Sequence, residues 1–245
     1  MPPSTRTEVE DDYSYSKQTR RQILSFSFYK VMPEWRRLSR SERDDHRHEA
    51  ADVLHRWCLP GELRMLTYST VGMRADCDMM LWRICYSLEC LQKMSTDLLG
   101  TRLGGYLQPA HSFLGMTRRS HYQISNSKMT DGDGNIHPGS CQYLFVYPYV
   151  KSRAWYQMPW EERQRIVTEY IRTVEHASRV RLHTTYSYGL DDQEFVIAYE
   201  TNHPEDFLDL VMRLRETENS SYIVRDTPMF TCLQVSLEEM LERLG

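Results

Sequence analysis

Apolar and polar positions alternate in several short stretches of the chain, and this two-residue period predicts strands. In the first half, the stretches are 22–32 (QILSFSFYKVM), 63–71 (LRMLTYSTV) and 106–122. In the second half they are 142–149, 179–188, 194–200 and 222–233. Turn-forming residues separate them, such as Pro33 after the first stretch and Gly189 between the stretches that end at 188 and begin at 194. The pattern therefore predicts strands in both halves of the chain.

Between these stretches, apolar residues recur every three or four positions, which predicts amphipathic helices. The segment 34–57 is highly charged, with apolar residues on one side. The segment 76–99 carries a helical stripe of Met80, Leu81, Ile84, Cys85, Leu88 and Leu91. Later helices are expected at 160–177, 204–217 and 237–244. Glu161 and Glu162 follow Pro159, as is typical of a helix start.

Strands and helices thus occur in two successive groups of similar length, which suggests a duplicated ferredoxin-like unit of the α+β class. We expect an N-terminal half at 21–124 and a C-terminal half at 141–245. The polar segment 1–20 is predicted to be a disordered or loosely docked tail. The stretch 125–140 reads as a loop. Its DGDGN faintly resembles a calcium loop, but Ile136 replaces the required glycine, so a solvated turn is the better interpretation.

Charge and composition narrow the classes of function. The chain has 30 Lys and Arg against 34 Asp and Glu, a net charge of −4, which disfavours a nucleic-acid surface. No apolar run approaches the ~18 residues of a membrane span, and no apolar leader precedes 21. The six cysteines include no C-x-x-C pair. We therefore expect a cytoplasmic protein with reduced thiols and no membrane span. The chain contains 16 Tyr and only 7 Phe, so many of its rings carry a hydroxyl.

Four segments resemble the chlorite dismutase-like family of haem proteins, closest to its coproheme decarboxylase branch. They are YSTVGMRADCDMMLWRICYSLECLQ (68–92), YLFVYPYVKSRAWYQMPWEERQRI (143–166), TTYSYGLDDQEFVIAYET (184–201) and YIVRDTPMFTC (222–232). The resemblance spans about residues 21–233. It implies a dimeric α+β barrel of two ferredoxin-like halves, with haem b or iron coproheme in the C-terminal half. It also implies a homo-oligomer, usually a pentamer.

The resemblance assigns roles to two residues of the second group. In the decarboxylases, the tyrosine of a Y-P-x-x-K strand motif forms a radical that attacks a haem propionate. Tyr147 and Lys151 match that motif, so Tyr147 would be the radical site and Lys151 would pair with a propionate. The alternative is that Tyr147 packs in the core and that Lys151 is a solvated strand end.

The iron-binding motif of the family, H-x-x-x-G-x-x-Y, is changed here. Tyr170 stands in the place of the histidine, Val174 in that of the glycine and Ala177 in that of the later tyrosine. A phenolate can bind haem iron, so Tyr170 is the candidate metal ligand. The alternative is a core aromatic on the apolar stripe of this helix. His176 is six positions further on and points to another side of the helix.

Three further residues are candidates by position. His183 matches a strand position where the chlorite dismutases carry arginine, so it could act as acid or base or bind iron from the other side; an ordinary strand histidine is the alternative. The missing arginine argues against chlorite dismutation. Arg153 and Arg225 could bind the remaining propionates.

Three functions fit these observations. The first is a haem-dependent oxidoreductase that resembles coproheme decarboxylase and converts coproheme propionates to vinyl groups with peroxide, a step of haem biosynthesis. The second is a non-catalytic or altered haem-binding paralogue, a structural or regulatory subunit that could assemble with a catalytic paralogue. The third is a barrel that binds a small hydrophobic ligand. The matches at Tyr147, Lys151 and Arg225 favour the first, and Tyr170 and Val174 favour the second.

Overall fold

One continuous sheet organises the molecule in the computed structural model, which describes residues 20–58, 63–120, 122 and 135–245. The N-terminal elements are β1 (Ile23–Val31), α1 (Arg40–Trp57), β2 (Leu63–Ser69), β3 (Met79–Cys85), α2 (Leu88–Leu99) and β4 (Leu107–Met116). The C-terminal elements are β5 (Tyr143–Lys151), α3 (Arg153–Gln157), α4 (Trp160–His176), β6 (Arg181–Tyr186), β7 (Phe195–Thr201), α5 (Pro204–Glu216), β8 (Ile223–Arg225), β9 (Phe230–Gln234) and α6 (Leu237–Glu242). Short 3-10 helices lie at Trp35–Arg37, Gly104–Tyr106 and Glu218–Tyr222.

The two halves repeat one strand order. The sheet runs β7-β6-β4-β1-β3-β2-β9-β5-β8, and β5 also pairs with β7, which closes the sheet into a barrel. The N-terminal half contributes the run β4-β1-β3-β2, and the C-terminal half the equivalent run β6-β7-β5-β9. Both are antiparallel ferredoxin-like units. The predicted α+β barrel of two ferredoxin-like halves is therefore confirmed.

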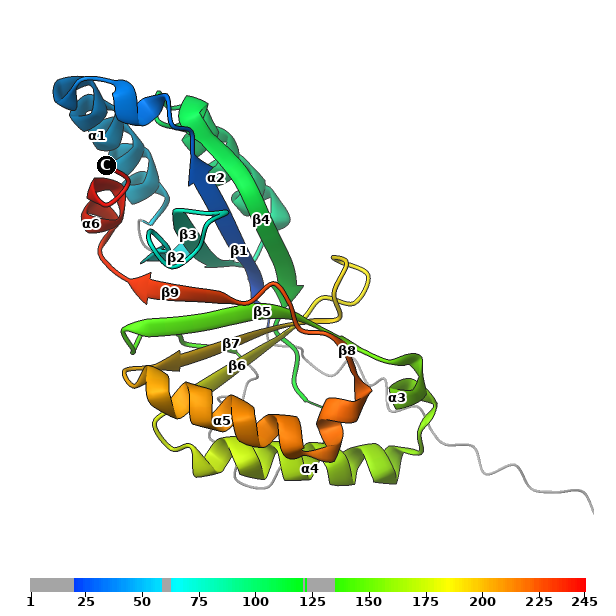
Figure 1. Ribbon diagram of the computed structural model, residues 1–245. Coiled ribbons are helices and arrows are strands. Elements are labelled where there is room, and N and C mark those ends of the chain that lie inside the picture. Colours follow the sequence, from blue (N-terminus) through cyan, green and yellow to red (C-terminus); the bar gives the residue numbers. More distant parts are fainter. Residues whose placement is uncertain (1–19, 59–62, 121, 123–134) are drawn as a thin grey trace, which may run out of the picture.

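The halves meet at two seams between sheet edges. At one seam Tyr68 of β2 pairs with Gln234 of β9, and at the other Met116 of β4 pairs with Tyr186 of β6. Figure 1 shows β9 beside β5 in the middle of the molecule, so the last strand links the two halves. The seams satisfy backbone groups that an open sheet would leave unpaired.

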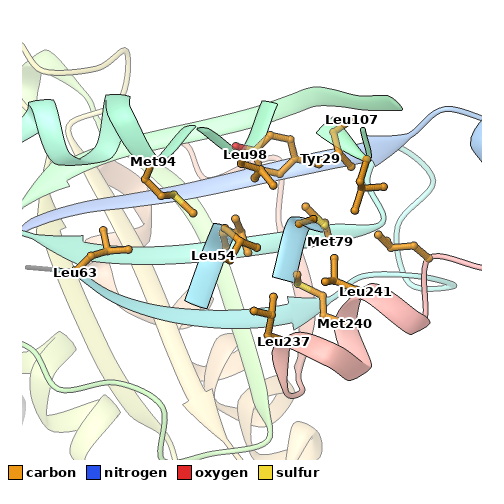
Figure 2. Close-up of a cluster of buried hydrophobic side chains, with 14 of the residues drawn as sticks. Tyr29, Leu54, Leu63, Met79, Met94, Leu98, Leu107, Leu237, Met240 and Leu241 are labelled. Carbon is orange, nitrogen blue, oxygen red and sulfur yellow. The ribbon is translucent and has the colours of Figure 1, made fainter. Parts of the chain in front are cut away.

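Three clusters of buried apolar side chains form the core of the molecule. The barrel interior holds one cluster, which includes the stacked rings of Phe28 and Phe230, with centroids 4.0 Å apart. A second lies between the N-terminal strands and helices α1, α2 and α6. Figure 2 shows its side chains Leu54, Met94, Leu98, Leu237 and Met240 gathered at the sheet. The third lies between the C-terminal strands and helices α4 and α5, which cover that face in Figure 1.

The expected helix at 76–99 is wrong over its first part. Met79–Cys85 is strand β3, and only Leu88–Leu99 is helical. Each residue of β3 is buried, because its two faces contact the barrel interior and the helix layer. A strand buried on both faces has no polar alternation, and its apolar run resembles a helical stripe. Strand β3 supplies the second central strand that the ferredoxin-like order requires.

Two expected strands are shorter or divided. The stretch 106–122 is strand only over Leu107–Met116, and 222–233 contains the two strands β8 and β9. The predicted tail at 1–20, except Arg20, and most of the predicted loop at 125–140 lie outside the described residues. Among the residues that the structure describes, no helix is both long and apolar enough to cross a membrane.

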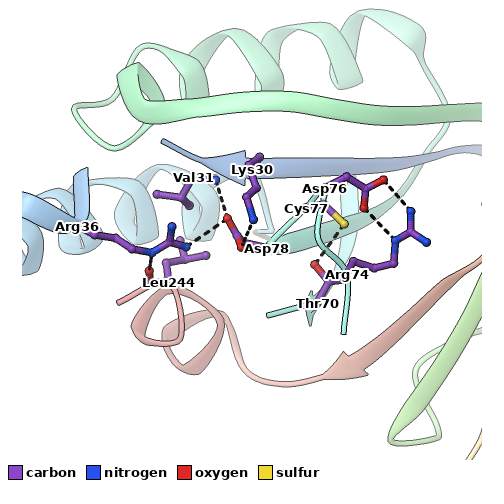
Figure 3. A network of polar contacts seen from close by, with 9 residues as sticks. All are labelled: Lys30, Val31, Arg36, Thr70, Arg74, Asp76, Cys77, Asp78 and Leu244. Carbon is purple, nitrogen blue, oxygen red and sulfur yellow. Dashed lines mark hydrogen bonds and ion pairs between the residues drawn. The ribbon is translucent and has the colours of Figure 1, made fainter. Parts of the chain in front are cut away.

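Asp78 connects the last two residues of β1 to the C-terminal end of the chain through hydrogen bonds and ion pairs. Its carboxylate accepts hydrogen bonds from the Val31 amide at 2.9 Å and from Lys30 Nζ at 2.9 Å. It also pairs with Arg36 at 3.2 Å, whose Nε donates to the Leu244 carbonyl at 2.9 Å (Figure 3). The Asp78 side chain is only 6% exposed, so water cannot replace these partners. A buried carboxylate with three donors holds the strand, the 3-10 turn and the chain end together.

We predict that Asp78→Asn lowers the free energy of unfolding by about 2 kcal/mol, because it removes the charge of a buried carboxylate that accepts from three donors. Urea unfolding followed by circular dichroism measures the change. The matched control is Glu239→Gln, which breaks the exposed pair with Arg243. That control should cost less than about 0.5 kcal/mol. Equal effects of the two substitutions would contradict the role given to Asp78.

Candidate functional site

A cavity of about 490 Å³ lies on the outer face of the C-terminal sheet, beneath helix α4. Its size is within the range of small-molecule sites. The walls come from strands β5, β6 and β7, helices α3 and α4, the segment after β4, and the 3-10 helix at 218–222. We call it the α4 pocket; its lining residues are Arg118, Arg119, Ser120, Tyr122, Tyr149, Lys151, Trp155, Tyr156, Arg163, Val167, Tyr170, Ile171, Leu182, Thr184, Tyr186, Tyr188, Phe195, Ile197 and Asn219.

Strand alternation decides which side chains reach the pocket. On β6, Leu182, Thr184 and Tyr186 line it, so the residues between them face the barrel interior. On α4, Arg163, Val167, Tyr170 and Ile171 line it, a spacing that places all four on one face of the helix. The pocket is thus formed where the outer side of a strand meets one helical stripe.

Lys151 is a buried cation of the pocket wall. It is 6% exposed, and its Nζ donates to the side-chain oxygen of Asn219 and lies 4.0 Å from the centre of the Trp155 ring. Asn219 in turn donates to the Tyr149 hydroxyl at 2.9 Å. Burial lowers the pKa of Lys151 to about 7, against an opposing influence of Glu194. Lys151 therefore changes charge near neutral pH, with its amine held at the cavity.

Three arginines add to the positive charge of the pocket. Arg118 and Arg119 follow strand β4, and Arg163 lies in the second turn of α4. Arg163 Nε is buried with no hydrogen-bond partner among the described atoms. Among the lining residues that the structure describes, none is Asp or Glu. The α4 pocket therefore favours an anion, and its aromatic walls favour a planar apolar body.

Tyr170 lines the pocket, and its hydroxyl is 2.6 Å from that of Tyr199. Burial raises the pKa of Tyr170 to about 12, although its bond with Tyr199 lowers it. The ring of Tyr147 is stacked near that of Tyr199, with centroids 6.3 Å apart. Burial also raises the pKa of Tyr147 and of Tyr199 well above the usual value. The three phenols form a neutral chain that runs from the pocket into the core.

The structure places Tyr147 behind the pocket wall rather than in it. Tyr147 belongs to the same buried cluster as Val174, which is 2% exposed. Tyr149, two residues further along the same face of β5, lines the pocket instead. Val174 packs in that cluster and, like Tyr147, is not a described lining residue of the pocket.

His183 does not reach the α4 pocket. It lies between Leu182 and Thr184 on β6 and so faces the barrel interior. There its Nε2 is 2.7 Å from a carboxylate oxygen of Glu200, and its ring meets Trp82 edge-on at 5.6 Å. From the sequence, His183 was a candidate acid, base or iron ligand. That role conflicts with this placement, because the ring lies on the opposite face of β6 from the pocket.

Arg153 and Arg225 are exposed and do not line the pocket. Arg153 begins helix α3, and Arg225 ends strand β8, where it pairs with Val150. Of the cations that do line it, Lys151 was predicted to bind a propionate, whereas Arg118, Arg119 and Arg163 were given no such role. A signal was present for Arg163, which precedes Tyr170 by seven positions and so shares its helical face.

Tyr170 is one of six tyrosines among the described lining residues, and a phenolate oxygen can bind haem iron. Among the described lining residues there is no histidine, cysteine or methionine. The described residues also contain no group of three His, Cys, Asp or Glu side chains that could hold a metal ion. A phenol of the described lining would therefore have to hold any iron bound in this pocket.

Comparisons with known proteins agree with this architecture. The family model described as chlorite dismutase matches residues 30–235. Coproheme decarboxylase of Mycolicibacterium smegmatis is 30% identical over 223 residues, covering 90% of this chain and 93% of that protein. Chlorite dismutase of Ideonella dechloratans is 27% identical, covering 83% of this chain and 72% of that protein.

Solved structures show the same fold. A mutant chlorite dismutase from Candidatus Nitrospira defluvii superposes with a TM-score of 0.83 at 24% identity, covering 91% of this chain and 95% of that one. The family match spans most of the sequence, and the strands within it form one barrel in the order given above. The chain therefore belongs to the chlorite dismutase family.

Proposed function

We propose that the α4 pocket binds an iron tetrapyrrole with carboxylate side chains, such as haem b or iron coproheme. We further propose that the chain acts on it as a haem-dependent oxidoreductase resembling coproheme decarboxylase. The observation that carries the proposal is the lining of the pocket. It combines Lys151 and three arginines with aromatic walls and, among its described residues, no carboxylate. The coproheme decarboxylase of Mycolicibacterium smegmatis, 30% identical, supports the choice of ligand.

The residues fit such a group in its charge and shape. Lys151 and Arg163 would hold propionates, since one is a buried ammonium and the other has a buried Nε without a partner among described atoms. Tyr170 would face the iron as a phenolic ligand. When bound, the group supplies the redox chemistry by which peroxide can oxidise a side chain of the tetrapyrrole.

The phenol chain gives Tyr147 a route to the pocket. Tyr170 lines the cavity, its hydroxyl is 2.6 Å from that of Tyr199, and the rings of Tyr199 and Tyr147 are stacked with centroids 6.3 Å apart. An electron lost at the pocket could be replaced from the next ring along this series. Tyr147 would then be a redox-active residue that acts through Tyr199 and Tyr170.

A second candidate function is a haem-binding subunit without decarboxylase activity. It is favoured by the Tyr170–Tyr199 bond, which engages the hydroxyl that would have to bind iron, and by Tyr147, which is not among the described lining residues of the pocket. Such a chain could form part of a homo-oligomer, for which we propose a pentamer, or join a catalytic paralogue. We propose a cytoplasmic location for either function.

We predict that Lys151→Met weakens the binding of ferric coproheme by about tenfold at pH 6, equivalent to ~1.4 kcal/mol. Titration followed by the haem absorption band measures this. Lys151 is charged below its pKa of about 7. Above that pH the Lys151 amine loses its charge, so wild-type affinity should fall by about tenfold in all and approach that of the Lys151→Met protein.

The matched control for this titration is Lys151→Arg, whose guanidinium stays charged and should remove the pH dependence. If the Lys151→Met protein bound ferric coproheme at pH 6 as tightly as the wild type, Lys151 would be excluded from binding. No absorption change at all in the wild type would overturn the proposed ligand class.

We predict that Tyr147→Phe slows vinyl formation from bound coproheme about 100-fold in the presence of hydrogen peroxide, a barrier increase of ~2.7 kcal/mol. Mass spectrometry follows the loss of carbon dioxide and two hydrogens from each propionate. Tyr156→Phe is the control, because Tyr156 lines the pocket and pairs with Tyr188 outside the phenol chain.

Unchanged vinyl formation in Tyr147→Phe would remove Tyr147 from the reaction. A wild-type protein that binds coproheme and forms no vinyl group with peroxide would instead establish the second candidate function.

A further inference from the structure

Two side chains of strand β5 reach the α4 pocket from the same face of the strand. Tyr149 and Lys151 are two residues apart, and strand alternation places both side chains on one side of the sheet. Both line the cavity, and they are only 8% and 6% exposed. The phenol and the amine therefore form adjacent parts of one buried wall.

Asn219 links these two groups. Its side-chain oxygen accepts from Lys151 Nζ, and its side-chain nitrogen donates to the Tyr149 hydroxyl oxygen at 2.9 Å. A charged amine can only donate, so the amide oxygen must face Lys151 and the amide nitrogen must face Tyr149. The ammonium of Lys151 thus fixes the direction of both hydrogen bonds.

Each group retains one donor for the cavity. The Tyr149 hydroxyl accepts from Asn219, and among the described residues none provides an acceptor for the phenol proton. Burial raises the pKa of Tyr149 above its usual value, so the phenol keeps that proton at neutral pH. Lys151 Nζ donates to the side chain of Asn219 and to its backbone carbonyl at 3.4 Å, which leaves a third proton. A buried donor without an acceptor is destabilising, and an acceptor in the cavity would remove that cost.

Two carboxylates outside the cavity hold this wall in place. Strand β5 leaves β7 at this point, and the Lys151 amide donates instead to Glu194 Oε2 at 2.7 Å. The 3-10 helix that carries Asn219 is joined to α4 by the pair of Glu218 and Arg165 at 2.6 Å. Neither carboxylate is among the described lining residues. The phenol and the amine are therefore preorganised, and the cavity side offers them no acceptor of its own.

We propose that Tyr149 is a specificity-determining residue of the α4 pocket, whose hydroxyl binds a carboxylate group of the ligand together with the Lys151 amine. The carboxylate would accept from the phenol and from the ammonium, because it has two oxygens and no proton to place. An alcohol at this position offers neither the charge nor the second oxygen. The proposal rests on the anionic ligand class proposed for this pocket, and not on iron or on the tetrapyrrole ring.

The test is a fluorescence titration of the full chain at pH 6 with two probes. Pyrenebutyrate is a planar apolar body that carries a carboxylate, and pyrenebutanol carries a hydroxyl in its place. We expect the wild type to bind the acid about tenfold more tightly than the alcohol. Tyr149→Phe should weaken binding of the acid about tenfold, or ~1.4 kcal/mol, and leave binding of the alcohol within about twofold.

The matched control is Tyr143→Phe on the same strand. Tyr143 is not among the described lining residues of the pocket, so its loss of a hydroxyl should change the affinity for neither probe.

Asn219→Asp tests the direction of the hydrogen bonds. The new carboxylate has no amide nitrogen, so it accepts the Tyr149 proton and turns that donor away from the cavity. The preference for the acid over the alcohol should then fall about tenfold although Tyr149 is still present. An unchanged preference in this variant would contradict the role given to Asn219.

Two further results would overturn the proposal. One is a wild-type protein that binds both probes equally or binds neither. The other is a Tyr149→Phe protein that binds the acid as tightly as the wild type, or loses affinity for both probes equally. If the acid is bound as predicted while ferric coproheme gives no absorption change, the function proposed for the pocket fails and the assignment of Tyr149 stands.

Discussion

The closure of the sheet into a ring is the constraint on which the rest of the structure depends. Each ferredoxin-like half has free strand edges, and the pairings of β2 with β9 and of β4 with β6 join them. Closure separates the side chains of every strand into those that fill the barrel and those that face a helix layer. Since the interior is packed with apolar and aromatic side chains, a pocket can form only outside it, beneath a helix.

This division explains the chemistry of the α4 pocket. Inside the barrel, the Glu200 carboxylate is hydrogen-bonded to the His183 ring and to the Gly139 amide. Outside, Lys151 and Arg163 face a cavity in which the described lining offers them no carboxylate. Several tyrosine hydroxyls form hydrogen bonds in the same region. Tyr170 bonds to Tyr199, Tyr156 to Tyr188, and Tyr149 to Asn219. Tyrosine is the suitable residue here because its ring packs against the sheet while its hydroxyl pairs at the pocket wall.

The sequence predicted most of the fold and part of the site. Helices and strands with one polar face were found, and the duplication followed from their order. Strand β3 was missed because both its faces are buried, so Met79–Cys85 contains almost no polar position to reveal the strand period. His183 was assigned by its place along the chain, although the alternation of Leu182 and Thr184 places it inside the barrel. That Tyr147 is buried with Val174 and does not line the pocket depends on tertiary packing, which no local pattern reveals.

The central claim is that the outer face of the C-terminal sheet, beneath α4, holds a carboxylate-bearing iron tetrapyrrole. A crystal structure of the chain with ferric coproheme tests it most directly. Our account predicts the ring between β6 and α4, with a propionate on Lys151 and the iron facing Tyr170. Electron density for the ring at another site, or inside the barrel beside His183, would contradict the account.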